Sequence, residues 1–209
     1  MSAGAEEARV LVIACGALAH DLVRVRQANR WEHLDIQCLP AELHNRPEKI
    51  APAVREKIRA ARATHKNIFV AYADCGSGGA LDRVLQEEKV ERLPGSHCYE
   101  FFAGAKKFNE LHNAELGTFY LTDFLARNFR RIIVRGLGID RHPELREVYF
   151  SNYKKLVFLD QSGAPELAAE AEEAARFLGL AYEHVPTGDA EFAAALRPVA
   201  PPVKQVNRA

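Results

Sequence analysis

Short apolar runs and helical patterns alternate along most of the chain. Five apolar runs have the length of a strand: residues 9–14, 34–39, 67–73, 155–160 and 181–186. Between them, apolar residues recur at helical spacing, as Ile50, Val54 and Ile58 do. Strands that alternate with helices form a mainly parallel sheet with helices on both faces. We therefore predict the α/β fold class, as a three-layer Rossmann-like sandwich.

The middle of the chain, residues 91–131, interrupts this alternation. Within it, an amphipathic helix is suggested by the positions of Phe119, Thr122, Phe124, Leu125 and Phe129. Strand signals are weak here, and short helical patterns follow one another. We therefore predict an irregular helical insertion, arranged around the functional site.

One domain accounts for the 209 residues, and its patterned region extends over residues 9–198. Residues 1–8 lack the order of a secretory signal, and residues 199–209 are rich in proline. We predict that both ends are flexible. No apolar run reaches the roughly 18 residues of a membrane-spanning helix, so we expect a cytoplasmic protein without a membrane partner.

The charge balance argues against a nucleic-acid partner. The chain has 28 basic and 28 acidic side chains, whereas nonspecific nucleic-acid binding needs a basic face. A local basic patch could form from Arg127, Arg130, Arg131 and Arg135. We interpret these arginines as the polar face and the end of a helix, where cations suit the helix dipole.

The four cysteines carry the most information about function. Cys15, Cys38 and Cys75 lie near the carboxyl ends of the first three predicted strands, and Cys98 lies in the irregular segment. Because the carboxyl ends of parallel strands meet at one edge of a sheet, we expect several thiols to gather there. Cys38 is followed by Leu39 and Pro40 and is explained as a small apolar residue.

Cys15 and Cys75 are each followed by a glycine where a strand passes into a helix. They could be buried fillers, but a thiol that faces a helix N-terminus should have a lowered pKa. Cys98 has His97 and Glu100 beside it, and no apolar pattern explains these two polar neighbours. We therefore include all three cysteines and both neighbours in the candidate site.

Two kinds of chemistry suit these residues. Three thiolates from Cys15, Cys75 and Cys98 suit zinc with a fourth ligand, or an iron–sulfur cluster with one open iron. His97 or His44 could supply the fourth ligand or carry a proton. No C-x-x-C spacing supports a metal, and the rival chemistry is a nucleophilic Cys75 with a histidine base.

The glycine-rich turn after the third strand is a candidate for contact with a substrate. Gly76, Ser77 and Gly78 occupy the place of a phosphate-binding loop, but the sequence is neither G-x-G-x-x-G nor G-x-x-x-x-G-K-[ST]. We interpret the glycines as allowing a tight turn and a close approach by a ligand.

Three further residues are candidates for substrate binding. Asn45 precedes a predicted helix, where it would also serve as a helix cap. Tyr120 and Thr122 follow Gly117 and could line a pocket. A half-buried aromatic helix face would explain them equally well.

A set of segments, taken in order, resembles the domain-of-unknown-function family 1638 over residues 9–185. The segments are VIACGAL, LHNRPEKI, YADCGSGG, HCYEFFAG, GTFYLTDFL and YFSNYKKLVFLDQ. The positions that match the family pattern are Cys15, His44, Asn45, Cys75, Cys98 and the stretch from Gly117 to Thr122. Many relatives have an acidic residue and a Gly-Trp pair that this chain replaces. Here His97 precedes Cys98, and Asp123 and Phe124 follow Thr122.

Members of that family are often found beside corrinoid-dependent methyltransferases for methylated amines. The resemblance implies one-carbon metabolism, a small-molecule substrate, and a corrinoid protein or methyltransferase as a partner. Our leading hypothesis is a zinc or iron–sulfur protein in that context, with the metal bound by the three cysteines. The alternatives are an accessory module that binds without catalysis, and a cysteine-nucleophile transferase or hydrolase.

Overall fold

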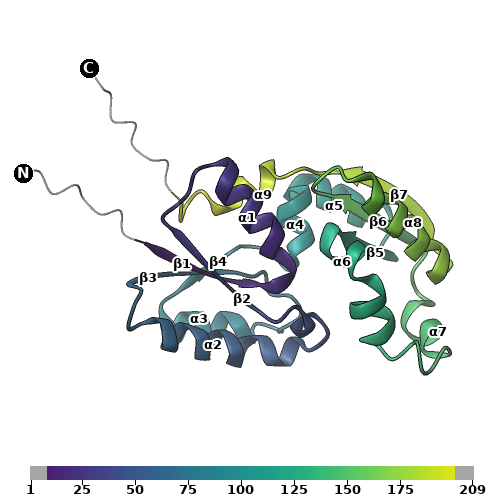
Figure 1. Cartoon of the computed structure of the whole chain (residues 1–209). Coiled ribbons are helices and arrows are strands. Elements are labelled where there is room, and N and C mark those ends of the chain that lie inside the picture. The colour runs from purple at the N-terminus through teal and green to yellow at the C-terminus, as the bar shows by residue number, and fades with distance from the viewer. Residues whose placement is uncertain (1–8, 201–209) are drawn as a thin grey trace, which may run out of the picture.

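A computed structural model describes residues 9–200 of the chain (Figure 1). Residues 1–8 and 201–209 lie outside the described part, and so do the predicted flexible N-terminus and most of the predicted tail. Of the two tail residues that are described, Ala200 is 1% exposed and packs in the core. Within residues 9–200, no helix is long and apolar enough to cross a membrane.

The α/β fold class is confirmed, and every strand pair is parallel. The strands divide between two sheets. Sheet A has the order β2-β1-β3-β4, and sheet B has the order β5-β6-β7. In chain order, the strands are β1 (Val10–Cys15), β2 (Leu34–Leu39), β3 (Asn67–Ala71), β4 (Glu91–Arg92), β5 (Thr118–Thr122), β6 (Lys155–Asp160) and β7 (Ala181–Pro186).

Sheet A is the middle of three layers because successive side chains of a strand point to opposite faces. On β1, Leu11 and Ile13 pack against the helices α2 (Ile50–Ala61) and α3 (Ala80–Glu88). Val12 and Ala14 pack on the other face, against α1 (Ala19–Ala28), α4 (Cys98–Ala103) and α9 (Ala190–Leu196). Figure 1 shows α2 and α3 below the sheet and α1 and α9 above it.

Sheet B has the same layered organisation. Leu156 and Phe158 of β6 face a core that includes α6 (Asp123–Arg127) and α8 (Pro165–Leu178). Val157 and Leu159 face the opposite side, where α5 (Ala105–Ala114) packs. The remaining helices are short: η1 (Gly16–Leu18), η2 (Ala41–Asn45), η3 (Pro47–Lys49), the π-helix η4 (Arg130–Arg135) and α7 (Leu145–Phe150).

The amphipathic helix predicted within residues 117–131 is wrong in its first part. Thr118–Thr122 forms β5, and its aromatic and β-branched residues suit a strand. Leu121 packs in the core under α8, whereas Tyr120 packs on the opposite face. This two-residue alternation, and not the helical pattern predicted for the segment, decides the local structure.

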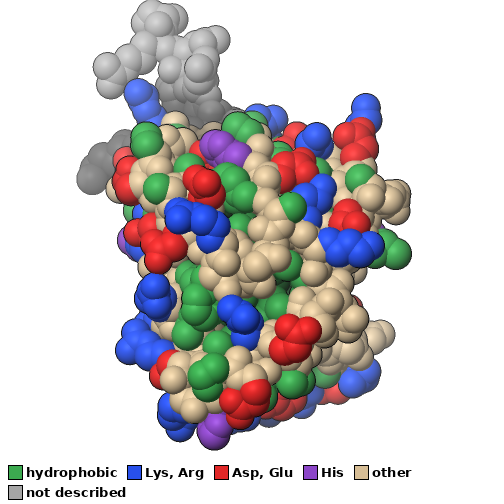
Figure 2. Space-filling view, turned by 90° about the vertical axis from the view of Figure 1, so that its right-hand side faces the viewer, with side chains coloured by type: hydrophobic (Ala, Val, Ile, Leu, Met, Phe, Trp, Pro, Cys, Tyr) green, Lys and Arg blue, Asp and Glu red, His purple; other side chains and the backbone are tan. Residues whose placement is uncertain are grey.

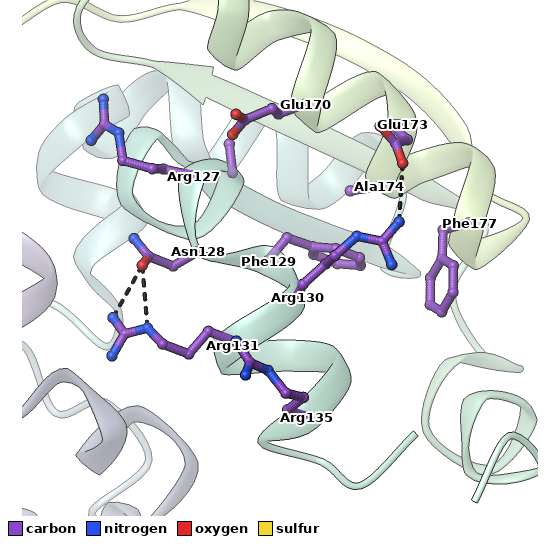
Figure 3. A pocket seen from close by; sticks show the side chains of 11 residues that line it. Arg127, Asn128, Phe129, Arg130, Arg131, Arg135, Glu170, Glu173, Ala174 and Phe177 are labelled. Atoms are coloured by element: carbon purple, nitrogen blue, oxygen red, sulfur yellow. Dashed lines mark hydrogen bonds and ion pairs between the residues drawn. The ribbon is translucent and has the colours of Figure 1, made fainter. Parts of the chain in front are cut away.

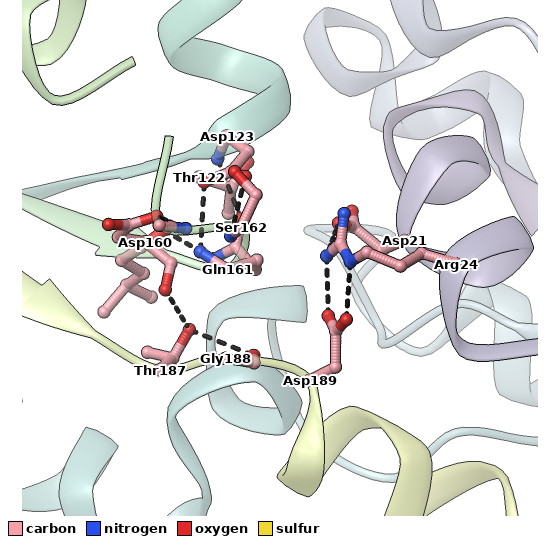
Figure 4. Close-up of polar contacts among 12 residues, drawn as sticks. Asp21, Arg24, Thr122, Asp123, Asp160, Gln161, Ser162, Thr187, Gly188 and Asp189 are labelled. Atoms are coloured by element: carbon pink, nitrogen blue, oxygen red, sulfur yellow. Dashed lines mark hydrogen bonds and ion pairs between the residues drawn. The ribbon is translucent and has the colours of Figure 1, made fainter. Parts of the chain in front are cut away.

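The chain returns from sheet B to sheet A at its end. The Phe192 ring of α9 lies 5.5 Å from Phe101 and 5.1 Å from Phe102 of α4. Arg24 of α1 binds the carboxylate of Asp189, just before α9, with one N–O distance of 2.6 Å (Figure 4). An apolar cluster and an ion pair therefore join the two ends of the described chain.

Candidate functional site

The strand order of sheet A identifies where a ligand would bind. The chain passes from β1 to β2 on one side and then crosses to β3 on the other side of β1. In an open parallel sheet, a reversal of this kind leaves a crevice beyond the carboxyl ends of the two central strands. Those two strands are β1 and β3: Cys15 is the last residue of β1, and Cys75 follows the end of β3 by four residues. We call this region of the sheet edge, with Cys15, Cys75 and Cys98, the crevice.

Close packing determines the position of Cys15. It is the last residue of β1 and pairs with Leu39 of β2. Gly16 follows it, and a Cβ on Gly16 would approach the Leu39 carbonyl oxygen to 2.8 Å and the Ala41 nitrogen to 3.0 Å. Only glycine permits this approach, so Gly16 is required for the β1 end to lie against the β2 end.

Cys75 has an uncommon backbone conformation. Its φ of +49° lies in the left-handed region, which a non-glycine residue adopts at a cost of about 1–2 kcal/mol. The surrounding structure holds it there, since the Cys75 amide donates to the Ser96 carbonyl at 2.9 Å and the Asp74 amide donates to the Gly95 carbonyl at 3.2 Å. These bonds bring the loop after β3 beside the segment that leads to Cys98.

The glycine turn after Cys75 binds its own carboxylate. The Asp74 side chain accepts from the Gly79 amide at 3.0 Å, from the Gly78 amide at 3.3 Å and from the Ser77 hydroxyl at 2.7 Å. A phosphate-binding loop keeps such amides free for its ligand. In this turn Asp74 occupies them, and Gly76 packs near Pro47. The turn is thus held closed by internal hydrogen bonds.

The structure brings Cys15, Cys75 and Cys98 into one electrostatic neighbourhood. The pKa of Cys75 is raised to about 12. Burial makes the largest contribution, and the nearby Cys15 thiol makes the next largest. Burial likewise raises the pKa of Cys98, with Cys75 and then Cys15 as the next contributors. Burial also raises the pKa of Cys15, to which Cys38 is the contributing thiol.

The predicted lowering of these thiol pKa values is therefore wrong. After Cys15, η1 runs directly into α1, and a hydrogen bond from the Ala17 backbone does lower the pKa of Cys15, but by less than burial raises it. After Cys75, α3 begins only five residues later, beyond the turn that Asp74 occupies, and a helix dipole acts within about one turn of the helix end. Loss of water around each thiol has the larger effect and keeps all three protonated at neutral pH.

A buried tyrosine hydroxyl with only a weak thiol neighbour also lies in this crevice. Tyr72 is 2% exposed, and no hydrogen bond of normal geometry reaches its hydroxyl oxygen among the described residues. The Cys15 thiol lies beside it as a weak hydrogen-bonding partner, and burial followed by Cys15 raises the pKa of Tyr72. An unsatisfied buried hydroxyl costs about 1–3 kcal/mol, so a polar or metal-bearing ligand would find an open hydrogen-bonding group here.

The two predicted histidines lie near each other at the rim of the crevice. His44 belongs to η2, and burial followed by the charge of His97 lowers its pKa. His97 is exposed and immediately precedes α4, and its ring lies 6.1 Å from that of Tyr99. A neutral imidazole with a lowered pKa suits a ligand or a proton acceptor.

Asp21 is the charged residue on the inner side of the crevice. It is 3% exposed on α1, and its carboxyl raises the pKa of Cys98. Burial raises the pKa of Asp21 to about 6, while Arg24, bound at 2.7 Å, acts in the opposite direction. Arg24 also binds Asp189, as Figure 4 shows. The sequence analysis did not select Asp21, although it occupies a position on the buried face of α1 with Leu22 and Val25.

Several other predicted site residues have structural roles. The Asn45 side-chain amide donates to the Ile132 carbonyl of η4 at 2.7 Å, and the Glu100 carboxylate accepts from the Ser96 amide at 3.1 Å. Thr122 caps α6 through a bond from the Leu125 amide. Cys38, which the sequence explained as a small apolar residue outside the site, is exposed on β2 and is not a buried filler.

Tyr120 differs from these residues because it reaches the crevice wall. Its ring centroid lies 5.3 Å from that of Tyr99, with the rings stacked, and its hydroxyl is buried without a partner in the described part of the chain. Tyr99 in turn lies near the thiols of Cys98 and Cys75, which contribute to its raised pKa after burial. Aromatic rings therefore continue the crevice from the thiols toward sheet B.

The model of the family described as "Protein of unknown function (DUF1638)" matches residues 38–196, which is more than half of the chain. The chain belongs to this family. No curated protein and no solved structure matches the chain.

The match to DUF1638 covers only some of the residues of the crevice. His44, Cys75 and Cys98 lie within the matched residues, whereas Cys15 and Asp21 precede them. The crevice of this DUF1638 protein thus combines residues of the matched region with residues of β1 and α1. Sequence reasoning identified its cysteines and histidines, but it missed Tyr72, Tyr99 and Asp21.

The donor chemistry of the crevice fits a soft metal, but the side chains do not form a ready-made site. Three thiols and the half-buried imidazole of His44 are groups that bind zinc or an iron–sulfur cluster. Over residues 9–200, however, no group of three or more His, Cys, Asp or Glu side chains is arranged to hold a metal ion. Metal binding by this DUF1638 protein would require the three thiols to move closer together.

Proposed function

We propose that the crevice of Cys15, Cys75 and Cys98 is the functional site and binds a soft metal as zinc or as an iron–sulfur cluster. The observation that supports this proposal most directly is that all three thiols pack against one apolar cluster. In agreement with this, Cys15 contributes to the raised pKa of Cys75, and both contribute to the raised pKa of Cys98. Three segments far apart in the sequence bring these thiols to the switch point of a parallel sheet. A metal that binds thiolates would remove the protons that burial retains on them.

The residues around the thiols define the roles available to this chain. His44, with its lowered pKa, is neutral at pH 7 and can serve as a further ligand or accept a proton. His97 lies beside it at the exposed rim. Tyr72 can donate its hydroxyl to a bound group, and Asp21 adds a carboxyl on the inner side. When bound, zinc would supply Lewis-acid chemistry, and a cluster would supply electron transfer.

The raised pKa values favour metal binding over the nucleophile alternative. A nucleophilic cysteine needs a thiolate near neutral pH, and reactive cysteines lie in electropositive surroundings that lower their pKa. Cys75 has a pKa of about 12 and an acidic neighbour, Asp74. A thiol in this environment remains protonated until a metal binds to it.

The physiological context of the proposal comes from the family resemblance. We place the site in one-carbon or methylated-amine metabolism, with a small-molecule substrate and a corrinoid protein or methyltransferase as partner. The thiols must be reduced, as they would be in the cytoplasm. A second candidate is a module that holds such a ligand without catalysis, which the stacked tyrosines at the crevice wall favour.

Metal titration of reduced protein under anaerobic conditions tests the proposal. We expect one zinc or cobalt ion per chain, with thiolate-to-cobalt charge-transfer absorption, or a cluster after reconstitution with iron and sulfide. C75S and C98S should each weaken binding by at least about 100-fold, since each removes one of three ligands. Affinity should rise with pH because the bound form has lost thiol protons.

Cys38 provides a matched control for this titration. It is a free cysteine in the same sheet but is exposed on β2. C38S should therefore bind metal as the natural protein does. Equal losses in C38S and C75S, or the absence of stoichiometric binding in the natural protein, would reject the metal centre. If C75S then still supports growth on a methylated amine, the non-catalytic module is the better description.

A further inference from the structure

A cavity that is separate from the crevice of Cys15, Cys75 and Cys98 lies between the π-helix η4 and α8. Its volume is about 460 Å³. Four arginines line it, together with two glutamates and two phenylalanines, as Figure 3 shows: Arg127, Arg130, Arg131, Arg135, Glu170, Glu173, Phe129 and Phe177. The sequence analysis interpreted these arginines as an ordinary polar helix face. They instead surround a hollow.

Two of the arginines are held in place by neighbours. Arg131 binds the Asn128 side-chain oxygen through two nitrogens, at 3.1 and 3.3 Å, and also pairs with Glu42 of η2. Arg130 pairs with Glu173 at 3.2 Å, and both side chains are more than half exposed. An exposed ion pair of this kind contributes little to stability, so Arg130 can exchange Glu173 for an anion that binds it more strongly.

The other two arginines have no anionic partner in the described part of the chain. Arg127 and Arg135 form no ion pair there, and Figure 3 shows no contact for them among the lining residues. The lining holds four arginines and two glutamates, and Glu42 from outside the lining pairs with Arg131, so one net positive charge remains. An excess of this sign inside a concave surface attracts anions.

A specific anchor maintains the arginine array. Four of the lining positions belong to η4 or flank it, and η4 is a π-helix, a rare form found often at functional sites. The Asn45 side chain donates to the carbonyl of Ile132 within η4. A Cβ on Gly136 would collide with that same carbonyl, so Gly136 has to be glycine. The chain thus has particular residues that stabilise an unfavourable helix.

The floor of the cavity is apolar. The rings of Phe129 and Phe177 lie 5.9 Å apart in an edge-to-face arrangement. A planar or hydrocarbon group could rest on this floor while arginines bind its anionic end, since guanidinium groups bind phosphate and carboxylate in pairs of parallel hydrogen bonds.

Basic and acidic side chains are mixed over the adjacent surface. Figure 2 shows the side of the molecule that carries α7 and α8, where blue and red side chains are interspersed. A large polyanion such as a nucleic acid needs a continuous basic face, which this mixture does not offer. The charge pattern is therefore suited to a small anion.

We propose that this arginine-lined cavity is a binding site for a small phosphorylated metabolite with a planar or apolar body. The proposal is independent of the thiol crevice, because none of the cysteines lines the cavity. The anion would displace Glu173 from Arg130 and recruit Arg127 and Arg135. The ligand needs at least two anionic oxygens to bind both Arg127 and Arg135.

Isothermal titration with ATP, inorganic pyrophosphate and adenosine tests this site. We expect ATP to bind, pyrophosphate to bind about tenfold more weakly because it lacks a ring for the apolar floor, and adenosine not to bind measurably. Binding should weaken as salt is raised. Citrate serves as a carboxylate probe, and stronger binding of citrate than of ATP would reassign the ligand class.

Charge variants locate the site. R127Q and R135Q should each weaken ATP binding by about tenfold, and E170Q should strengthen it by a few-fold. Arg176 is the control because it lies in the last turn of α8 and does not line the cavity. R176Q should bind as the natural protein does. An R176Q loss equal to that of R135Q, or no ATP binding in the natural protein, would overturn the proposal.

Discussion

The carboxyl edges of the two sheets differ in how completely their polar groups are satisfied. At sheet B, Asp123 of α6 accepts from the Gln161 and Ser162 amides, each at 3.0 Å, and the Asp123 amide donates to the Gln161 side chain at 2.8 Å (Figure 4). Asp160 binds the Gly163 amide at 2.7 Å and His184 at 2.9 Å. Every group in this network has a partner.

At sheet A, the same position in the fold holds thiols with raised pKa values, a strained Cys75 and a Tyr72 hydroxyl with only a weak thiol neighbour. Natural cores seldom leave buried polar groups unsatisfied, and strain persists only where the surroundings impose it. The comparison indicates that the edge of sheet B serves stability and that the edge of sheet A serves function.

The largest expected effect comes from breaking the sheet B network. D123A removes the acceptor for two backbone amides in a residue that is 4% exposed. Each orphaned buried donor costs about 1–3 kcal/mol, so the free energy of unfolding should fall by about 2–5 kcal/mol. Urea unfolding measures this loss. D140A, at an exposed position, is the control and should remain near the natural value.

Asp21 lies at the boundary between the two edges, and its effect depends on pH. Its folded pKa of about 6 lies above the ordinary 3.8, so the protonated form is favoured by folding. The stability that this provides is complete below about pH 4 and is lost as the pH rises through about 6. D21N keeps a neutral side chain at every pH.

We therefore expect D21N to gain stability relative to the natural protein as the pH rises from 4 to 7, by up to about 3 kcal/mol. Urea unfolding at several pH values measures the difference. Arg24 should remain bound through Asp189 in the variant. A constant difference across this pH range would show that Asp21 does not have a raised pKa.

Tyr72 gives the smallest of the three effects and the sharpest test of the comparison. Y72F removes a buried hydroxyl that has no hydrogen bond of normal geometry and only the weak Cys15 thiol beside it, so the free energy of unfolding should rise by up to about 1 kcal/mol. The same substitution at Tyr182 removes a hydroxyl that donates to the Ala168 carbonyl at 3.2 Å. Y182F should therefore lower stability by a similar amount.

Tyr182 lies near the amino end of β7. Opposite signs for these two tyrosine variants would support the distinction between a poorly satisfied hydroxyl at the edge of sheet A and a satisfied hydroxyl within sheet B. Destabilisation by Y72F equal to that by Y182F would mean that the Tyr72 hydroxyl is already satisfied. Thermal unfolding in the absence of added metal is the measurement, because a bound ligand would itself stabilise the fold.

Much of the fold was predictable because it depends on local patterns. The five apolar runs are all strands in the structure, and the helical spacing of Ile50, Val54 and Ile58 forms the buried face of α2. The error lay in β5, which was predicted to be part of a helix. The predicted helical pattern ran across a strand and the helix that directly follows it. The division into two sheets was not predicted, because pairing between strands depends on contacts that no local pattern encodes.

The amino-acid sequence by itself determined that the cysteines stand at strand ends and that the strands are parallel, since both follow from hydrophobic periodicity and chain order. Only the tertiary structure decided that burial raises the thiol pKa values, that Asp74 fills the glycine turn and that Asp21, Tyr72 and Tyr99 join the crevice. These properties depend on which groups lose water and which neighbours they meet. Both are set by packing between segments distant in the sequence.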